Sequence, residues 1–388
     1  MNYTESEIME YIEEEDAKFI RLAFRDAFGV QKNISIMPSE VHKAFDKGIP
    51  INAKAIRGFE GCGEAVLYLK PDPATLSVLP WRPDSGRVLR MFCDVCKGDG
   101  KPFEADTRNI LKDAVKAAEE AGIEFKFGSE LEFYLFKTDD EANPTKIPYD
   151  EAGYLDIAPL DRGENIRREI CLTIEEMGLT PERSHHERGP GQNEIDFHYG
   201  KPLKAADQVT TFKMVVNTVA DRNGLYADFS PLPIADKPGN GYHINIYAKN
   251  RDGEDVVKYA AAGILDKIKD ITIFLNPTDA SYNRFGNGTA PTKVNWSREG
   301  GSELMYINSA GTKVELRSPD ALSNPYLVHA LLIYAGLYGI ENKLELPQEM
   351  DESSVLLPKS RREAMKNAKN SDFIKELLPE SIIDKYIS

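Results

Sequence analysis

The sequence predicts an α+β protein in two parts, a small sheet-rich domain at residues 1–100 and a larger domain at 101–388. Residues 29–98 contain short apolar runs separated by turn residues, which is typical of strands. The turn cluster Gly98–Pro102 marks the boundary, because glycine and proline interrupt regular structure. Beyond it, long helical patterns alternate with strands.

In the first part, apolar residues recur with a roughly helical spacing at Ile8, Ile12, Phe19 and Leu22, so we expect a helix within residues 5–26. Four runs that favour strands follow it: Ile34–Met37, Ala65–Leu69, Val78–Trp81 and Val88–Cys93.

In the second part, Asp106 is an N-cap for a helix that ends at Ala121, just before Gly122. Four more helices are expected from the same kind of pattern: Arg162–Met177, Ala205–Arg222, Val256–Lys269 and Tyr326–Leu344.

The composition limits the possible partners. The chain has 388 residues, of which 41% are hydrophobic and 29% charged, as in ordinary globular proteins. Its net charge of −15 opposes binding to nucleic acid or to an anionic membrane, so we expect neither partner, but it is compatible with divalent cations. The first residues lack a secretion signal and no apolar run reaches about 18 residues, so we expect a cytoplasmic protein.

The segment Ser184–Phe197 organises the rest of the chain. Glu187 and Glu194 lie on either side of the corner Gly189–Gly191, and polar and apolar residues alternate after it. Such alternation predicts a strand with its polar residues on one face. Glycine and proline permit the chain reversal, which brings Glu187 back toward Glu194. A hairpin with a solvated acidic face explains the same pattern.

Three other strands carry strong metal ligands on one face and apolar residues on the other. Glu130 and Glu132 share a face of the run Phe125–Phe136, whose remainder is largely apolar. The polar faces of the other two runs carry His243 and Glu315. Five carboxylates and one imidazole suit Mg²⁺ or Mn²⁺, but the alternation does not decide whether the strands meet.

Seven segments, in order along almost the whole chain, resemble the type I glutamine synthetases. They read FRDAFGV at 24–30, KPFEADTRN at 101–109, GSELEF at 128–133, SHHERGPGQNEIDF at 184–197, GNGYH at 239–243, NPTDASYNR at 276–284, and KVELRSPD at 313–320 followed by NPY at 324–326.

The resemblance implies an N-terminal β-grasp domain and a C-terminal glutamine-synthetase catalytic domain, in which helices pack on an antiparallel sheet. It implies two or more Mg²⁺ or Mn²⁺ ions in two ligand sets. The set for the cation beside the amino-acid substrate is Glu132, Glu187 and Glu194. The set for the cation beside the nucleotide phosphates is Glu130, His243 and Glu315.

The resemblance also implies roles for residues that touch the substrates. Arg284 and Arg317 match the catalytic arginines that bind the carboxylates of the substrate, a task that suits the planar guanidinium. Gly239 matches a backbone contact to this small-molecule carboxylate, such as an amino acid. Asn245 lies on the nucleotide side. The family forms homo-oligomeric rings, so a hexamer or dodecamer is expected.

The chain departs from the family pattern where the phosphate and ammonium groups bind. Two phosphate-binding arginines are replaced at Gly300-Gly301 and at Tyr306, and the flap glutamate is replaced by Thr289. Further departures are Asn52, Leu232, Pro238, Asn245 and Tyr247. Arg298, Lys293 and Lys313 are the cations considered as replacements, with Arg298 first.

These departures leave three functions open. The first is an ATP-dependent carboxylate–amine (γ-glutamyl) ligase, acting on ammonia or another amine, with the use of ATP undecided. The second is an ATP-independent metal enzyme that acts on an amide or related C–N bond in the same pocket. The third is a non-catalytic ring protein that binds an amino acid.

Overall fold

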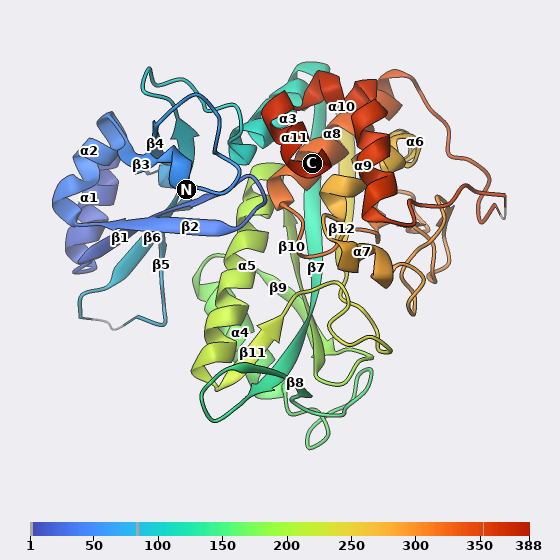
Figure 1. The fold of residues 1–388 in the computed structure, drawn as a ribbon, viewed down its shortest axis with the longest axis horizontal. Coiled ribbons are helices and arrows are strands. Elements are labelled where there is room, and N and C mark those ends of the chain that lie inside the picture. The colour runs from blue at the N-terminus through green and yellow to red at the C-terminus, as the bar shows by residue number, and fades with distance from the viewer. Residues whose placement is uncertain (1–2, 83–84, 352) are drawn as a thin grey trace. The chain divides into compact units, whose positions relative to one another are not determined.

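The computed structural model describes residues 3–82, 85–351 and 353–388, and its contacts divide the chain into two units (Figure 1). The first unit comprises Met1–Ile110, Glu176–Gly178 and Pro379–Lys385, and the second comprises the remainder. The expected domain boundary at residue 100 stays a prediction.

The first unit contains a six-stranded sheet in the order β2-β1-β6-β4-β3, with β5 paired to β6. β1 and β6 are parallel and the other pairs are antiparallel. The central strand β6 is buried along most of its length, as its apolar sequence predicts. The elements are α1 (Glu5–Glu14), β1 (Phe19–Arg25), β2 (Gln31–Ile36), α2 (Val41–Asp46), β3 (Ile49–Asn52), β4 (Val66–Pro71), β5 (Ser77–Val78) and β6 (Val88–Cys96).

The helix expected within residues 5–26 was predicted to carry apolar residues as far as Leu22, but the helix in the structure ends earlier. α1 begins in a capping box at Thr4 and ends at Glu14, and Asp16 then turns the chain with φ 48°. Residues from Phe19 onward form β1, in which Ile20 and Leu22 are fully buried and pair with β6. The alternation of period 2 in this segment is short, and the parallel pairing with β6 decides its conformation.

The second unit is built on a nine-stranded sheet in the order β13-β14-β15-β12-β7-β10-β9, with β8 and β11 also paired to β7. All pairs are antiparallel except β13 with β14. The strands are β7 (Ile123–Thr138), β8 (Pro144–Pro148), β9 (Pro181–His186), β10 (Gln192–Gly200), β11 (Leu225–Asp228), β12 (Tyr242–Asn250), β13 (Trp296–Ser297), β14 (Met305–Ile307) and β15 (Val314–Leu316).

The five helices expected in the second part are present, with ends shifted by a few residues. Asp106 accepts the backbone N–H of Arg108 at 3.1 Å, and Gly122 follows the helix with φ 76°. The five are α3 (Thr107–Ala121), α4 (Glu164–Glu176), α5 (Pro202–Arg222), α6 (Val257–Leu275) and α8 (Pro325–Glu341). The structure adds the shorter helices α7 (Asp279–Arg284), α9 (Arg361–Asn370), α10 (Asp372–Leu377) and α11 (Glu380–Ile387).

The two faces of the large sheet differ in character. Leu131, Phe133, Ile195 and Ile244 are fully buried, and α5, α6 and α8 form the helical layer beside the sheet (Figure 1). α6 and α8 approach closely at Gly263, where a Cβ atom would lie 2.2 Å from a backbone oxygen of α8. The helices therefore cover the apolar face, and the alternating polar residues point to the other side.

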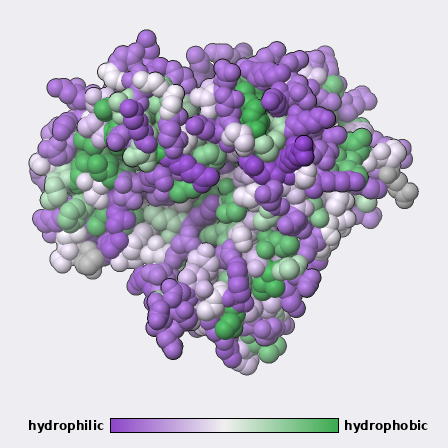
Figure 2. Space-filling model, in the orientation of Figure 1, coloured by the Kyte–Doolittle hydropathy of each residue, from purple (hydrophilic) through white to green (hydrophobic). Residues whose placement is uncertain are grey.

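The face of the molecule in Figure 2 is mostly hydrophilic, with apolar residues scattered among the hydrophilic ones. Among the described residues, none of the helices is long and apolar enough to span a bilayer.

Candidate functional site

Strand register places the predicted ligands side by side on the polar face of the sheet. On β7, Glu130 lies opposite His243 of β12, and Glu132 lies opposite Glu194 of β10. Glu315 of β15 pairs with the next polar position of β12. Because residues opposite each other in antiparallel strands lie about 5 Å apart, this register gathers the side chains.

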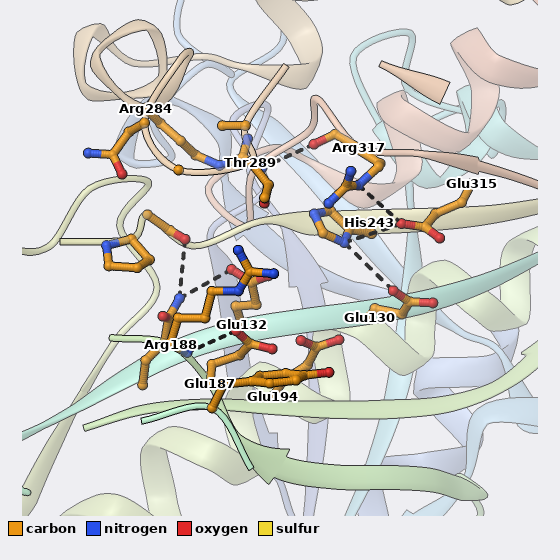
Figure 3. Close-up of a pocket in the computed structure, with 17 residues that line it drawn as sticks. Glu130, Glu132, Glu187, Arg188, Glu194, His243, Arg284, Thr289, Glu315 and Arg317 are labelled. Carbon is orange, nitrogen blue, oxygen red and sulfur yellow. Dashed lines mark hydrogen bonds and ion pairs between the residues drawn. The ribbon is translucent and has the colours of Figure 1, made fainter. Parts of the chain in front are cut away.

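All six predicted ligands line one pocket, together with Gly239, Arg284 and Arg317 (Figure 3). The sequence left open whether the four strands meet, and the structure brings them together. Five other lining residues were not among the predicted site residues, although Arg188 and Gln192 lie within the segment 184–197: Tyr154, Arg188, Gln192, Asn287 and Gly288.

Glu130, His243 and Glu315 form one potential cation site. Their donor atoms all lie within 4.8 Å of one another, and His243 Nδ1 is 3.6 Å from an oxygen of each carboxylate. Burial alone would raise the pKa of Glu130, but the hydrogen bond and charge of His243, with a 2.7 Å hydrogen bond from Asn245, lower it to about 2. Two carboxylates and one imidazole are a ligand set that suits Mg²⁺ or Mn²⁺.

Glu187 and Glu194 form a second potential site, and His185 joins them within the same 4.8 Å limit. Glu132 lines the pocket beside them, but its Oε2 atom accepts hydrogen bonds from the Gly241 N–H at 2.8 Å and from Gln192 at 3.2 Å. Burial, followed by the charge of Glu132, raises the pKa of both Glu187 and Glu194. Such crowded carboxylates are stabilised by protons or by a cation.

The two predicted arginines are fixed in the pocket wall. Arg284 is buried and donates to the backbone oxygens of Ser318 at 2.8 Å and of Arg317 at 3.0 Å. The guanidinium of Arg317 donates to the backbone oxygen of Gly301 and lies 3.3 Å from Glu315. Both positive charges are therefore held in place beside the carboxylates.

Two glycines allow close packing around the pocket. A Cβ atom on Gly239 would lie 2.4 Å from a backbone oxygen and 2.9 Å from Arg284, so a larger residue would displace that arginine. A Cβ atom on Gly189 would lie 1.9 Å from the hydroxyl of Tyr134, which donates to the Pro238 oxygen at 2.6 Å. Tyr134 thus links the corner after Glu187 to the segment that carries Gly239.

The residues predicted for the nucleotide side are dispersed. Asn245 contacts Glu130, and the charge of Lys313 acts on both Glu130 and Glu315. Arg298 is half exposed, pairs with Glu349 at 3.1 Å and stacks over Trp296, outside the set of pocket-lining residues. Its role as a phosphate ligand stays a prediction, as does that of Lys293.

Arg183 is a further cation near the first site. It extends from β9, contacts Asp196 at 2.7 Å, and reaches to 4.0 Å from Glu130 with its side chain 62% exposed. It lies two residues before His185 and therefore on the same face of β9. This spacing could have revealed it in the sequence.

A buried network holds the corner that carries Glu187. Asp150 accepts from His186 at 2.9 Å and from the Gly191 N–H at 3.0 Å, and His186 contacts the Glu187 backbone oxygen at 2.6 Å. Asp161 completes a third group of possible metal ligands, but it is paired with Arg167. We interpret this network as structural.

Comparisons with known proteins agree with this geometry. A family model described as glutamine synthetase, catalytic domain, matches residues 104–388, and one described as glutamine synthetase, beta-Grasp domain, matches residues 16–98. The chain is 40% identical to the glutamine synthetase of Clostridium saccharobutylicum, with 100% of this chain and 94% of the relative covered. It is 39% identical to that of Methanosarcina mazei, with 99% and 92% covered.

Solved structures give the same result. One titled "GmaS/ADP complex-Conformation 1" superimposes with a TM-score of 0.90 at 26% identity, covering 100% of this chain and 94% of the other. One titled "Apo GmaS without ligand" gives a TM-score of 0.89, also at 26% identity, with 98% and 93% covered.

Proposed function

Since this chain belongs to the glutamine synthetase family of ligases, we propose that it uses ATP to join the side-chain carboxylate of an amino acid to an amine. Such a reaction requires cations for phosphoryl transfer, a clamp for the acceptor carboxylate and room for the amine. The observation that carries the proposal is that six metal-ligating side chains and two arginines line a single pocket.

The ligand chemistry fits two divalent cations. Glu130, His243 and Glu315 would hold the cation on the nucleotide side. Glu132, Glu187 and Glu194 would hold the other, with His185 within reach of it. Bound cations supply charge neutralisation for the transferred phosphoryl group and for the carboxylate that receives it.

The chain's own residues perform the positioning. We assign Arg284 and Arg317 to the acceptor carboxylates, with Gly239 giving the substrate access to the backbone beside them. Their guanidinium groups are already oriented by backbone oxygens, so little reorganisation is needed when the substrate binds.

For the phosphates, we propose Arg183, supported by Lys313 and Asn245. Both arginines are exposed and paired, Arg183 with Asp196 and Arg298 with Glu349. Arg183 is preferred because its guanidinium also lies 4.0 Å from the pocket-lining Glu130, whereas neither Arg298 nor Glu349 lines the pocket. A solved relative whose title reports an ADP complex supports the use of a nucleotide by this chain.

The test is amide formation coupled to ADP release. Purified protein is given glutamate, ATP, Mg²⁺ or Mn²⁺, and a panel of amines, and both products are quantified. We expect stoichiometric ADP and amide with at least one amine, and a loss of both in Glu130→Gln. If ADP and amide fail to form with every amine and either cation, the ligase proposal is wrong.

A second candidate is metal-dependent hydrolysis of an amide without nucleotide. It is favoured by residues 299–307, which contain no arginine, and by the Gly301 backbone oxygen, which accepts from Arg317. This candidate predicts release of ammonia from glutamine with Mn²⁺ in the absence of ATP, and an unchanged rate on adding ATP.

A further inference from the structure

Arg188 differs from the other two arginines of the pocket. In the part of the chain that the structure describes, no hydrogen bond or ion pair reaches its guanidinium. The guanidinium carbon lies 5.8 Å from the centroid of the Tyr154 ring. By contrast, Arg284 and Arg317 donate to several backbone oxygens. Arg188 therefore presents its donors to whatever enters the pocket.

Arg188 occupies the outer part of the pocket. It is exposed, as is Tyr154 at 53%, whereas Arg284 is 2% exposed and the Arg317 side chain 13%. In Figure 3 it rises from the Glu187 side and faces Thr289 across the pocket. The lining segment 287–290 on that opposite wall contains Asn, Gly, Thr and Ala, so no acidic side chain there compensates the positive charge.

We propose that Arg188 binds a carboxylate carried by the amine substrate, so that the second substrate is an amino acid or a similar anionic amine rather than ammonium. The inference rests on the proposed ligase function. A free guanidinium binds a carboxylate through two parallel hydrogen bonds, and its charge repels a small cation such as ammonium.

The depth of the three arginines assigns the two substrates. The buried Arg284 and the largely buried Arg317 contact the acceptor, which must bind between the two cation sites. Arg188 lies farther out, beside Glu187, and is exposed, so we assign it to the second substrate. Its guanidinium lies 5.8 Å from the centroid of the Tyr154 ring, at the outer limit of a cation–π contact.

The chemical balance is that of any ATP-dependent amide synthesis. The γ-phosphoryl group of ATP passes to an oxygen of the acceptor carboxylate, and ADP leaves. The amine nitrogen then forms a bond to the acyl carbon and phosphate is expelled. Starting from the protonated amine, one proton is released overall. The carboxylate of the amine takes no part in the bond changes and serves only in recognition.

The experiment compares amines at saturating glutamate and ATP: ammonium, methylamine, glycine and β-alanine. We expect kcat/KM to be highest with glycine or β-alanine. In Arg188→Met the KM for that amine should rise about tenfold to a hundredfold, because a charge-assisted hydrogen-bond pair is lost. The KM for glutamate should stay unchanged, and that for methylamine should stay unchanged or fall, because a charge that repels the protonated amine is removed. Arg188→Lys should recover part of the loss, and Arg168→Met, an exposed arginine on α4, is the matched control.

Three results would overturn the inference while leaving the ligase proposal intact. The first is better turnover of ammonium or methylamine than of either anionic amine by the wild-type protein. The second is a higher KM for glutamate, instead of for the amine, in Arg188→Met. The third is equal calorimetric affinity of the wild-type protein and Arg188→Met for β-alanine in the presence of Mn²⁺. The calorimetric measurement needs no turnover, so it tests Arg188 even if no amide is formed.

Discussion

Glu130 is the residue on which the nucleotide side of the pocket depends. Its neighbours His243 and Asn245 lower its pKa to about 2, so the carboxylate is charged at neutral pH and available to a cation. Glu130→Gln keeps the shape of the side chain but removes the charge. We expect Mn²⁺ affinity to fall about a hundredfold by calorimetry, since a charged ligand is lost.

A matched control for Glu130 is Glu175→Gln, an exposed acid on α4. If both variants bound Mn²⁺ like the wild-type protein, Glu130 would not be a ligand.

Arg183 offers a second test at the residue scale. If this guanidinium contacts the nucleotide phosphates, Arg183→Met should raise the KM for ATP about tenfold, the cost of one lost charged hydrogen bond. The KM for glutamate should not move, because Arg284 and Arg317 are unaffected. An unchanged KM for ATP, with Arg168→Met as the control, would return the phosphate role to Arg298, Lys293 or Lys313.

Alternation along the strands marked Glu130, Glu132, Glu194, His243 and Glu315, because polar residues within otherwise apolar runs share a polar face. The chain reversal at Gly189–Gly191 added Glu187, and the division into two ligand sets came from the family resemblance. Alternation gave no sign of Arg188, which follows directly after Glu187 at a corner where no periodicity applies. It also gave no sign that His185 would join Glu187 and Glu194 in a group whose donor atoms lie within 4.8 Å of one another.

At the scale of elements, His329 joins α8 to its surroundings. Its Nε2 atom lies 3.0 Å from the hydroxyl of Tyr242 on β12, its Nδ1 atom lies 3.2 Å from the Pro202 backbone oxygen, and its ring stacks on Phe127. Full burial lowers the pKa of His329 to about 4. The folded protein therefore keeps this imidazole neutral where an unfolded chain would protonate it.

The consequence is a pH-dependent stability. Between pH 6.5 and about 4, His329 binds a proton in the unfolded chain but not in the folded protein. Its contribution to the free energy of unfolding is therefore complete above pH 6.5 and is lost as the pH falls toward 4. At pH 5 this loss amounts to about 2 kcal/mol relative to pH 7. In urea unfolding, the free energy of unfolding of His329→Gln should fall by about 2 kcal/mol less between pH 7 and pH 5 than that of the wild-type protein. Equal slopes for the two proteins would contradict the assignment.

Long elements with a clear period were predictable, and short ones were not. α3, α5, α6 and α8 have caps or long apolar stripes, and all were expected within a few residues. β1 was merged into the preceding helix because its strand character depends on the partner β6, about 70 residues away. The C-terminal helices α9 to α11 were not among the expected helices, and each has only six to ten residues, too few to repeat a helical period many times.

At the scale of the whole molecule, we expect a ring of identical chains, since the glutamine synthetase family is usually oligomeric. Native mass spectrometry should give about 260 kDa for a hexamer or about 520 kDa for a dodecamer of the 43.4 kDa chain. A single species at the mass of one chain would contradict this prediction. A second measurement at nanomolar concentration would show whether the ring dissociates on dilution, as a weakly associated ring would.

The central claim is that six side chains, from β7, β10, β12, β15 and the corner at Glu187, hold two cations in one pocket. Anomalous diffraction at the manganese edge, from crystals grown with Mn²⁺ and ADP, tests it most directly. We predict two peaks per chain, one among Glu130, His243 and Glu315 and one beside Glu187 and Glu194. Crystals with no peak in this pocket, or with manganese only at other sites, would contradict the account.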